Sequence, residues 1–380
     1  MRLLVVCDDP PLPGLPSSAG HTHILEQVLP AWRRRGVDVR VLTFGRAAAA
    51  AGLTVLPLEP SRVRALRAPR VVAERSGPGA RRAVGAASAE VDVTLVHGHG
   101  CFGLVDAVRS PLVANEIDPM SLFWTDQVPG LAAAAALAGR VRAARLRRGE
   151  VRAARVAAAY LVVDTRDATD LGSALGREVV AVPLGVSPVA TLAAVLPDGL
   201  LGRPVLSMTG SLDHAPNIAS ARELVTEVLP RVRRVVPGAA VVLAGRRPAA
   251  EVLALAGPDV VVLADVPSTA GVHAAASVAV FPGGWGRGSR NSVREALMTG
   301  TPVVASAASA RGLVPGPGLQ VAAGADALAA AVVALLADEG LLAAASRSAA
   351  DLGAALPSWE QVADLYLALL SDVAALGPAG

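Results

Sequence analysis

The sequence predicts an α/β protein with two Rossmann-like domains, each built on a doubly wound parallel sheet. The chain has 380 residues, which is more than one hydrophobic core usually organises. Apolar residues make up 53% of it, a share that suits strands buried on both faces. Short apolar runs alternate with amphipathic segments, and this alternation starts again past the middle of the chain. These observations favour two successive α/β domains.

The first half of the chain begins with an apolar run over 3–7, which predicts a strand. A helix is expected over 22–35, where the segment ends in three arginines and a glycine. Further strands are expected over 37–44, 91–98, 111–117, 160–165 and 179–185. Proline and glycine are mixed with short apolar pieces over 186–203, which indicates a boundary. We therefore expect the first domain to span 1–186.

The second half repeats the pattern. Strands are expected over 204–210, 239–245, 260–266, 278–284 and 302–308, with helices over 217–234 and near 291–299. We expect this domain to span 187–356. The segment 357–380 contains a final amphipathic helix, expected over 358–376.

Composition limits the chemistry that is open to the chain. All 35 basic residues are arginine, so any cationic contact to a phosphate must come from a guanidinium group. The two cysteines, Cys7 and Cys101, provide no disulfide framework and no metal-ligand spacing. No apolar run reaches the roughly 18 residues that span a bilayer, and the first residues are typical of a strand rather than a signal peptide. We expect a cytoplasmic protein.

A basic helix is predicted over 140–155, where seven arginines occur. A solvated face of the first domain is the favoured interpretation. Docking to anionic lipid is a second interpretation, so membrane contact is considered but not favoured. Nucleic-acid binding is the least favoured of the three, because no aromatic residues are interleaved with the arginines.

The segment 281–304 carries the clearest chemical signal. Between an expected strand and an expected helix lies a loop with four glycines, whose backbone can approach a ligand closely: Gly283, Gly284, Gly286 and Gly288. The start of the following helix offers free N–H groups and the positive end of its dipole. Both features suit the binding of a diphosphate.

Polar side chains around this helix start fit the same ligand. Ser289 or Asn291 is expected to cap the helix, and Arg287 and Arg290 can bind phosphate oxygens. Glu295, about one turn inside the helix, can accept two hydrogen bonds from a ribose diol. An ordinary turn with surface arginines is the alternative interpretation.

This segment resembles the C-terminal signature of family 4 glycosyltransferases. The segments 209–248, 182–188 and 358–370 resemble the same family, and the resemblance is strongest over 204–313. It implies a GT-B fold, with two Rossmann-like domains facing a cleft and a nucleotide-sugar donor held mainly by the second domain. It also implies transfer with retention, no metal ion or other cofactor, and a final helix that packs back on the first domain.

The resemblance assigns roles to individual residues. Glu295 matches the second glutamate of the family's E-x7-E motif, which binds the ribose hydroxyls. Arg287 stands at the first glutamate, a position that contacts the donor sugar, and we assign it a catalytic role.

Three positions where relatives carry a cation have lost it. Many members hold the diphosphate with an arginine and a lysine at the positions of Ser211 and Asn217, and a related branch often has a lysine at Ser292. We expect Arg287 and Arg290 to replace this charge.

Further donor contacts follow from the same resemblance. Gly210, beside Ser211, is expected to border the donor, and Gly20 matches a loop that touches the diphosphate. Arg246 stands where the family places a residue near the base, and Val266 where backbone groups read the base edge. His99 matches a catalytic histidine that faces the donor sugar. Surface loops are the alternative for Arg246 and Val266, and a structural loop histidine for His99.

The acceptor side is less well defined. Glu116 and Asp118 follow an expected strand and are assigned to an acceptor hydroxyl, with a solvated loop as the alternative; His21 is assigned to the same side. A small molecule, a glycan and a lipid carrier all remain open as the acceptor. Short loops in the first domain slightly favour a soluble acceptor, as in secondary metabolism.

Two His-x-His pairs raise the possibility of a transition-metal site, His21/His23 and His97/His99. We do not favour it, because the family's site needs no metal and no acidic or thiol partner is evident.

The sequence thus predicts a glycosyltransferase that moves a hexose-type sugar from a nucleoside diphosphate to a hydroxyl or amine. UDP is the first expected nucleotide and GDP the second. A nucleotide-sugar 2-epimerase and a non-catalytic nucleotide-sugar-binding subunit are alternatives. A dehydrogenase is disfavoured, because no G-x-G-x-x-G follows the first strand.

Overall fold

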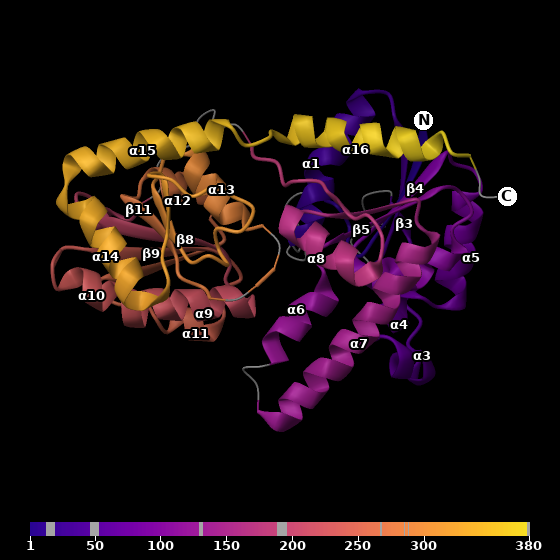
Figure 1. Cartoon of the computed structure of the whole chain (residues 1–380), viewed down its shortest axis with the longest axis horizontal. Helices are drawn as coiled ribbons and strands as arrows, with labels where there is room; N and C mark the ends of the chain where they lie inside the picture. Colours follow the sequence, from indigo (N-terminus) through magenta and orange to yellow (C-terminus); the bar gives the residue numbers. More distant parts are fainter. Residues whose placement is uncertain are drawn as a thin grey trace. The chain divides into compact units, whose positions relative to one another are not determined.

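The chain forms two compact units, each with one parallel sheet (Figure 1). The computed structural model describes residues 1–12, 20–45, 53–128, 132–187, 196–266, 268–284, 286–287 and 289–377. The first unit comprises Met1–Gly185 and Trp359–Gly380, and the second comprises Val186–Ser358. The predicted α/β class is confirmed.

The sheet of the first unit has the strand order β3-β2-β1-β4-β5-β6-β7, and its pairings are parallel. The strands are β1 (Arg2–Cys7), β2 (Asp38–Thr43), β3 (Thr54–Val55), β4 (Val93–His97), β5 (Leu112–Ile117), β6 (Ala159–Val162) and β7 (Val180–Ala181). The order changes direction between β1 and β4. In open α/β sheets, ligands bind beyond the carboxyl ends of the strands at such a point.

Helices cover both faces of this sheet and create two apolar cores. One core includes Trp32 and Tyr366, and the other includes Phe102 and Tyr160. The helices are α1 (Gly20–Arg34), α3 (Arg62–Arg67), α4 (Arg70–Arg75), α5 (Pro78–Ser88), the 3₁₀ helix η1 (His99–Ala107), α6 (Met120–Gln127), α7 (Ala133–Val156), α8 (Thr165–Leu175) and α16 (Trp359–Ala374). The arginine-rich segment lies within α7, which is longer than expected because an alanine-rich stretch precedes it.

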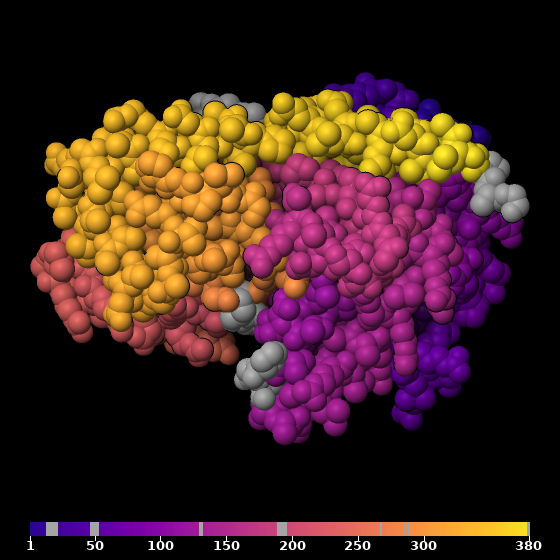
Figure 2. All heavy atoms as spheres, viewed as in Figure 1, coloured from indigo at the N-terminus to yellow at the C-terminus, as the bar shows by residue number. Residues whose placement is uncertain are grey.

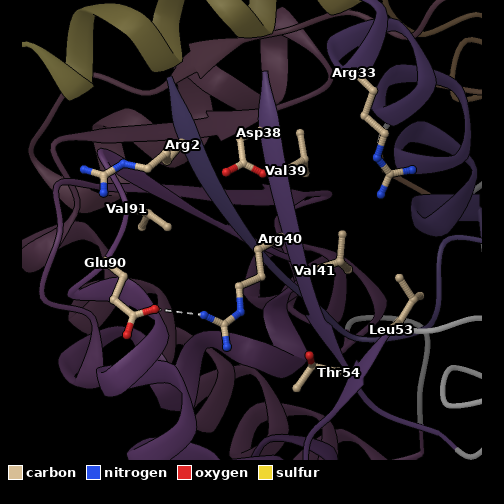
Figure 3. A pocket seen from close by; sticks show the side chains of 10 residues that line it. All are labelled: Arg2, Arg33, Asp38, Val39, Arg40, Val41, Leu53, Thr54, Glu90 and Val91. Carbon is tan, nitrogen blue, oxygen red and sulfur yellow. Dashed lines mark hydrogen bonds and ion pairs between the residues drawn. The ribbon is translucent and has the colours of Figure 1, made fainter. Parts of the chain in front are cut away.

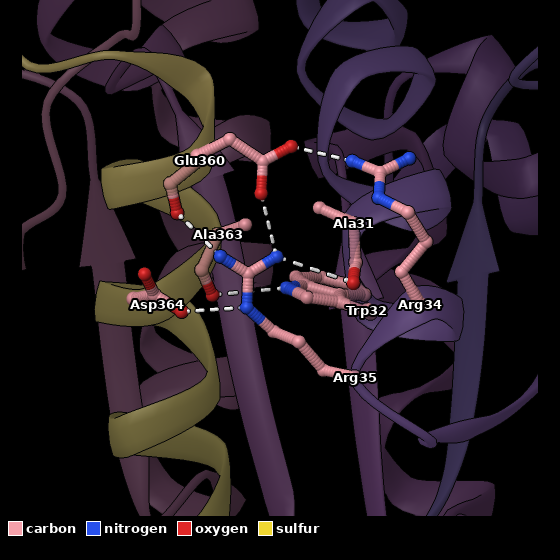
Figure 4. A network of polar contacts seen from close by, with 7 residues as sticks. All are labelled: Ala31, Trp32, Arg34, Arg35, Glu360, Ala363 and Asp364. Atoms are coloured by element: carbon pink, nitrogen blue, oxygen red, sulfur yellow. Dashed lines mark hydrogen bonds and ion pairs between the residues drawn. The ribbon is translucent and has the colours of Figure 1, made fainter.

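The final helix, α16, packs on α1 (Figure 4). The indole Nε1 of Trp32 donates a hydrogen bond of 3.0 Å to the carbonyl of Ala363. Arg35 donates to carboxylate oxygens of Glu360 and Asp364, each at 2.7 Å. The outer side of α16 lies at the surface of the first unit (Figure 2).

The second unit has the strand order β10-β9-β8-β11-β12-β13, again with parallel pairings. Its strands are β8 (Val205–Ser211), β9 (Ala240–Arg246), β10 (Val260–Ala264), β11 (Val278–Phe281), β12 (Val303–Ala305) and β13 (Leu319–Val321). All residues of β11 and β12 are buried. The parallel arrangement places the ends of β8, β9, β10 and β11 at one edge of the sheet.

The helices around this sheet are η3 (Asp198–Leu200), α9 (Ala215–Glu223), the π-helical segment η4 (Leu224–Val228), α10 (Leu229–Arg233), α11 (Ala250–Leu253), α12 (Thr269–Ala274), α13 (Asn291–Met298), α14 (Gly324–Ala337) and α15 (Glu339–Ala354). The single helix expected over 217–234 therefore contains a π segment. Pro230 follows this segment and has no N–H to donate, which is consistent with the change in hydrogen bonding.

No single helix among the described residues is long and apolar enough to cross a membrane. The pair α14 and α15 reaches that length and composition only together, with a bend of 107° between them. Leu328, Val332 and Leu335 of α14 are buried in the core of the second unit, as in the core helix of a globular domain.

Candidate functional site

The loop between β11 and α13 places an arginine in partly buried surroundings. Nη1 of Arg290 donates a hydrogen bond of 3.1 Å to Oδ1 of Asn217, at the start of α9. Burial lowers the pKa of Arg290 to about 10, so the guanidinium remains charged at neutral pH. Within the described residues no carboxylate forms an ion pair with it. The arrangement is a partly buried cation held by a neutral amide.

Asn217 links this arginine to the end of β8. Its Nδ2 donates a hydrogen bond of 3.0 Å to the carbonyl of Ser211. Ser211 and Asn217, two of the three positions where the resemblance implies a cation in relatives, therefore contact each other, and Asn217 also contacts Arg290. Nearby, the pKa of His214 lies below its ordinary value because of desolvation and, secondarily, the charge of Arg290.

The prediction that Ser289 or Asn291 caps α13 is wrong. The residue at the N-cap position of α13 is Arg290, with φ −85° and ψ 112°, and no side chain caps the helix. Neither Ser289 nor Asn291 serves this purpose, because the chain enters helical geometry only after Arg290, whose side chain extends to Asn217. The amino end of the helix consequently lacks a side-chain acceptor and can bind an anion.

Glu295 is the fifth residue of α13, and a threonine positions its side chain. Oγ1 of Thr269, the first residue of α12, donates a hydrogen bond of 2.7 Å to Oε2 of Glu295. Thr269 was not identified from the sequence. Its only signal was Ser268, which precedes an apolar segment and caps α12 by accepting from the N–H of Gly271.

Two glycines precede the last residues of β8 and β9. Gly210 and Gly245 face each other in the sheet, as do Ser211 and Arg246. A Cβ atom on Gly245 would lie 1.7 Å from the carbonyl oxygen of Gly210. A side chain at Gly245 would clash with the Gly210 backbone, so glycine allows the two strands to approach closely at this edge.

Further predicted donor residues of the second unit lie near the same edge. Arg246 ends β9, and Val266 follows β10 and packs against a small apolar core. Gly284 is exposed in the loop after β11, and Arg287 is partly exposed in the same loop. Gly288 lies outside the described residues. Gly20 is the first residue of α1, in the first unit.

In the first unit, the end of β4 leads into a loop that a buried carboxylate supports. The N–H of Gly100 donates a hydrogen bond of 3.3 Å to Oδ2 of Asp8. A Cβ atom on Gly98 or Gly100 would lie 2.6 Å from an oxygen of that carboxylate. His99, between these glycines, is partly exposed at the start of η1. Asp8, which directly follows β1, was not identified from the sequence.

His97 has a structural role. It is fully buried, and its Nδ1 lies 3.1 Å from Nδ2 of Asn115, which also donates to the hydroxyl of Tyr366. Among the described residues, no cluster of three or more histidine, cysteine or acidic side chains could hold a metal ion. The side chain of His21 lies outside the described residues.

Glu116 is not in a solvated loop, and that alternative is wrong. It belongs to β5, is 2% exposed, and accepts a hydrogen bond of 2.7 Å from the hydroxyl of Tyr160. Burial raises its pKa well above the ordinary value, and the nearby carboxylate of Glu150 adds to the shift. An acceptor molecule cannot reach this carboxylate as it lies here. Asp118 follows the strand and is partly exposed.

One charged cavity of the first unit does not contain the predicted residues. It has a volume of about 420 Å³ and lies by the starts of β1 and β2 (Figure 3). Its charged groups include Arg40 and Glu90, which pair at 3.2 Å, and Arg2, which pairs with Asp92 at 2.7 Å. The predicted ligand side is the opposite edge of the sheet.

Comparison with known proteins identifies the second unit. Residues 203–338 match the sequence model of the family described as "Glycosyl transferases group 1". The second unit carries a glycosyltransferase domain. This domain includes the donor residues predicted in the second half of the chain, from Gly210 to Glu295. The predicted enzyme class is confirmed, whereas membership of family 4 remains a prediction.

Solved structures share the fold of this glycosyltransferase. Alr3699/HepE from Anabaena, solved in complex with UDP-glucose, is 16% identical, with a TM-score of 0.69 over 97% of this chain and 99% of that chain. Sucrose-phosphate synthase from Thermosynechococcus elongatus is 15% identical, with a TM-score of 0.73 over 99% and 100%. The glycosyltransferase SnogD from Streptomyces nogalater is 22% identical, with a TM-score of 0.52 over 97% and 99%. A search of curated protein sequences finds no match. The predicted GT-B fold class is confirmed.

Proposed function

We propose that this glycosyltransferase moves a hexose-type sugar from a nucleoside diphosphate to an acceptor hydroxyl or amine, with retention at the anomeric carbon. The observation that supports this most strongly is the environment of Arg290. A partly buried guanidinium bonded to a neutral amide beside an uncapped helix start is complementary to a diphosphate. The negative charge of that ligand supplies the partner that the described residues do not.

UDP is the nucleotide we propose first, with GDP second. The Anabaena protein Alr3699/HepE was solved with UDP-glucose and with UDP, which supports this order. In the proposal, the Glu295 carboxylate binds the ribose hydroxyls, with Thr269 fixing one of its oxygens at 2.7 Å. Arg246 and the backbone at Val266 lie at neighbouring strand ends and would contact the base.

The proposed chemistry relies on stabilising the leaving group. Negative charge grows on the diphosphate as the bond to the anomeric carbon breaks. This charge would be stabilised by Arg287, Arg290 and the N–H groups at the start of α13. The acceptor attacks from the same face, and the departing phosphate takes its proton. His99 would orient the donor sugar. The protein contributes mainly orientation and charge, and we propose a cytoplasmic enzyme that needs no metal ion.

We propose a small molecule, a glycan or a lipid carrier as the acceptor, and a role in secondary-metabolite or glycan biosynthesis. Glu116 is excluded from direct contact by its burial. Asp118, after β5, and His21, in α1, remain the proposed acceptor residues.

A thermal-shift panel of UDP, GDP, dTDP, ADP and NAD tests the proposal. A ligand at 100 times its Kd stabilises the folded state by about 2.7 kcal/mol. We expect one diphosphate to stabilise the native chain and the Arg222→Gln control, but not Arg290→Gln. Arg222 is exposed on α9, so the control makes the same charge change outside the site. Equal responses in both variants, or no response to any nucleotide, would contradict the proposal. Turnover of the corresponding nucleotide sugar with an acceptor then distinguishes transfer from binding alone.

A further inference from the structure

A basic recess lies on the first unit, between η1 and α7. It has a volume of about 440 Å³ and is lined by Asp106 of η1 and by six residues of α7: Arg147, Arg148, Val151, Arg152, Arg155 and Val156. α6 and α7 pack against each other (Figure 1). The lining residues of α7 belong to the half of the helix nearer to its carboxyl end. Four guanidinium groups therefore surround one small space.

The positive charge of the recess is only partly balanced. Arg152 lies 3.4 Å from the Asp106 carboxylate, and Arg147 lies 3.2 Å from Glu150. Glu150 is itself buried and accepts hydrogen bonds from the N–H and the hydroxyl of Ser121. Neither Arg148 nor Arg155 forms an ion pair with any residue in the described part of the chain. Two cationic groups at the recess thus have no anionic partner there.

The spacing of the arginines makes this cluster unfavourable without an anion. Arg148 and Arg152 are four residues apart on α7, and Arg155 is three residues further, so all three share one face of the helix. Like charges at this spacing destabilise a helix. The helix is nevertheless well anchored, since Leu146, Glu150 and Ala153 are buried on its inner side. The guanidinium groups therefore extend from a rigid support.

We propose that this recess binds a phosphate-bearing group. The planar guanidinium group binds two phosphate oxygens at once, and several arginines around one recess can surround the anion. Val151 and Val156 provide a short apolar border for the part of the ligand that carries the phosphate. A soluble phosphate ester and a phospholipid headgroup present the same chemistry. None of the residues that line the recess is among the proposed donor residues.

Two probes distinguish the sources of the phosphate: inorganic pyrophosphate, measured by titration calorimetry, and phosphatidylcholine vesicles with or without phosphatidylglycerol, measured by co-sedimentation. Both use the full chain with Arg290→Gln, so that the proposed donor site contributes little. The test variant adds Arg148→Gln and Arg155→Gln. The matched control adds Arg62→Gln and Arg140→Gln, two exposed arginines outside the recess.

We expect the control to bind one of the probes and the test variant to bind it at least about ten-fold more weakly. Binding of pyrophosphate identifies a soluble ligand, and binding only to phosphatidylglycerol vesicles identifies a lipid headgroup. Equal affinity in test and control, or binding of neither probe to the control, overturns the proposal. A variant that carries only Arg148→Gln and Arg155→Gln should bind UDP as the native chain does. The UDP measurement therefore tests the proposed donor site separately from the phosphate site in the recess.

Discussion

At the scale of single residues, the hydrogen bond from the charged Arg290 to the uncharged amide of Asn217 is the most informative feature of the second unit. The two side chains are 73 positions apart in the sequence and meet at 3.1 Å. An amide orients the guanidinium without cancelling its charge. A carboxylate at the same place would form an ion pair and remove the attraction for an anionic ligand.

Asn217→Asp tests this argument with almost no change of shape. We expect the new carboxylate to pair with Arg290 and to reduce UDP affinity by about ten-fold or more, since buried charge pairs interact strongly. Asn217→Ala removes the amide without adding charge and serves as the control, with a smaller loss. Titration calorimetry measures both affinities, and similar losses in the two variants would refute the role of charge.

If Glu295 contacts the ribose, its replacement should weaken the binding of UDP but not the binding of pyrophosphate. Glu295→Gln weakens hydrogen bonds to the ribose hydroxyls, and bonds to a charged group contribute about 1.5–3 kcal/mol. We expect at least a ten-fold lower affinity for UDP and an unchanged affinity for pyrophosphate. If both ligands weaken equally, the carboxylate does not contact the ribose.

The buried imidazole of His273 predicts a pH dependence of stability. Its ring nitrogens lie 2.8 Å from Ser207 Oγ and 2.9 Å from Thr209 Oγ1, and burial lowers its pKa to about 3. The unfolded chain therefore binds more protons than the folded chain between about pH 6.5 and pH 3, and stability falls as the pH falls through that range.

Urea denaturation at pH 8 and pH 5 measures this effect. Relative to His273→Gln, the native chain should lose about 2 kcal/mol between the two pH values, from a slope of about 1.36 kcal/mol per pH unit below pH 6.5. The comparison with the glutamine variant removes the contributions of other titrating groups. Parallel losses in both proteins would show that His273 is not the cause.

At the scale of helices and strands, the apolar runs predicted most of the sheet. The run expected at 204–210 forms β8 (Val205–Ser211), and the run at 239–245 forms β9 (Ala240–Arg246). Two short edge strands were missed, because β3 (Thr54–Val55) and β13 (Leu319–Val321) are too short to show a periodic pattern. The π segment within the predicted helix was also missed, since it changes hydrogen bonding without changing the apolar spacing.

The site was predictable only in part for a related reason. The glycine-rich loop and Glu295 were found because they are consecutive or closely spaced in the sequence. Contacts such as that of Thr269 in α12 with Glu295 in α13 join separate helices, so only the folded chain brings them together. The misplaced helix cap shows the same limit, because Arg290 is held by a residue from another helix.

The close approach of β8 and β9 should not tolerate a side chain at Gly245. Gly245→Ala would place a Cβ atom 1.7 Å from the Gly210 carbonyl, so we expect a loss of about 3 kcal/mol or more in stability. Gly257→Ala is the control, because no atom lies within 4 Å of its Cβ position. Thermal or urea denaturation compares the two, and a stable Gly245→Ala variant would contradict the geometry.

At the scale of the whole molecule, the last helix belongs to the first unit. Val362, Tyr366 and Leu370 of α16 are part of the same core as Trp32 of α1. Apolar burial holds the helix in place, while the exposed pairs of Arg34 and Arg35 with Glu360 lie at the surface. Surface ion pairs add little to stability.

Replacing residues on the two sides of this helix tests the distinction. Tyr366→Ala creates a cavity and removes the acceptor of a hydrogen bond from Asn115. We expect it to lower the free energy of unfolding by about 3–5 kcal/mol. Glu360→Gln, on the exposed side, should leave the urea midpoint close to that of the native chain. A larger effect from Glu360→Gln would mean that electrostatic attraction, rather than burial, attaches the helix.

The first unit is assembled from two distant stretches of the chain, Met1–Gly185 and Trp359–Gly380. During synthesis on the ribosome, the sheet of this unit emerges early, but the helix that covers Trp32 emerges only after the second unit. Domains generally fold as they are made, and here the second unit can complete its core first. A chain that stops before Trp359 would keep an uncovered apolar face, so chaperones and proteases could recognise truncated products by it.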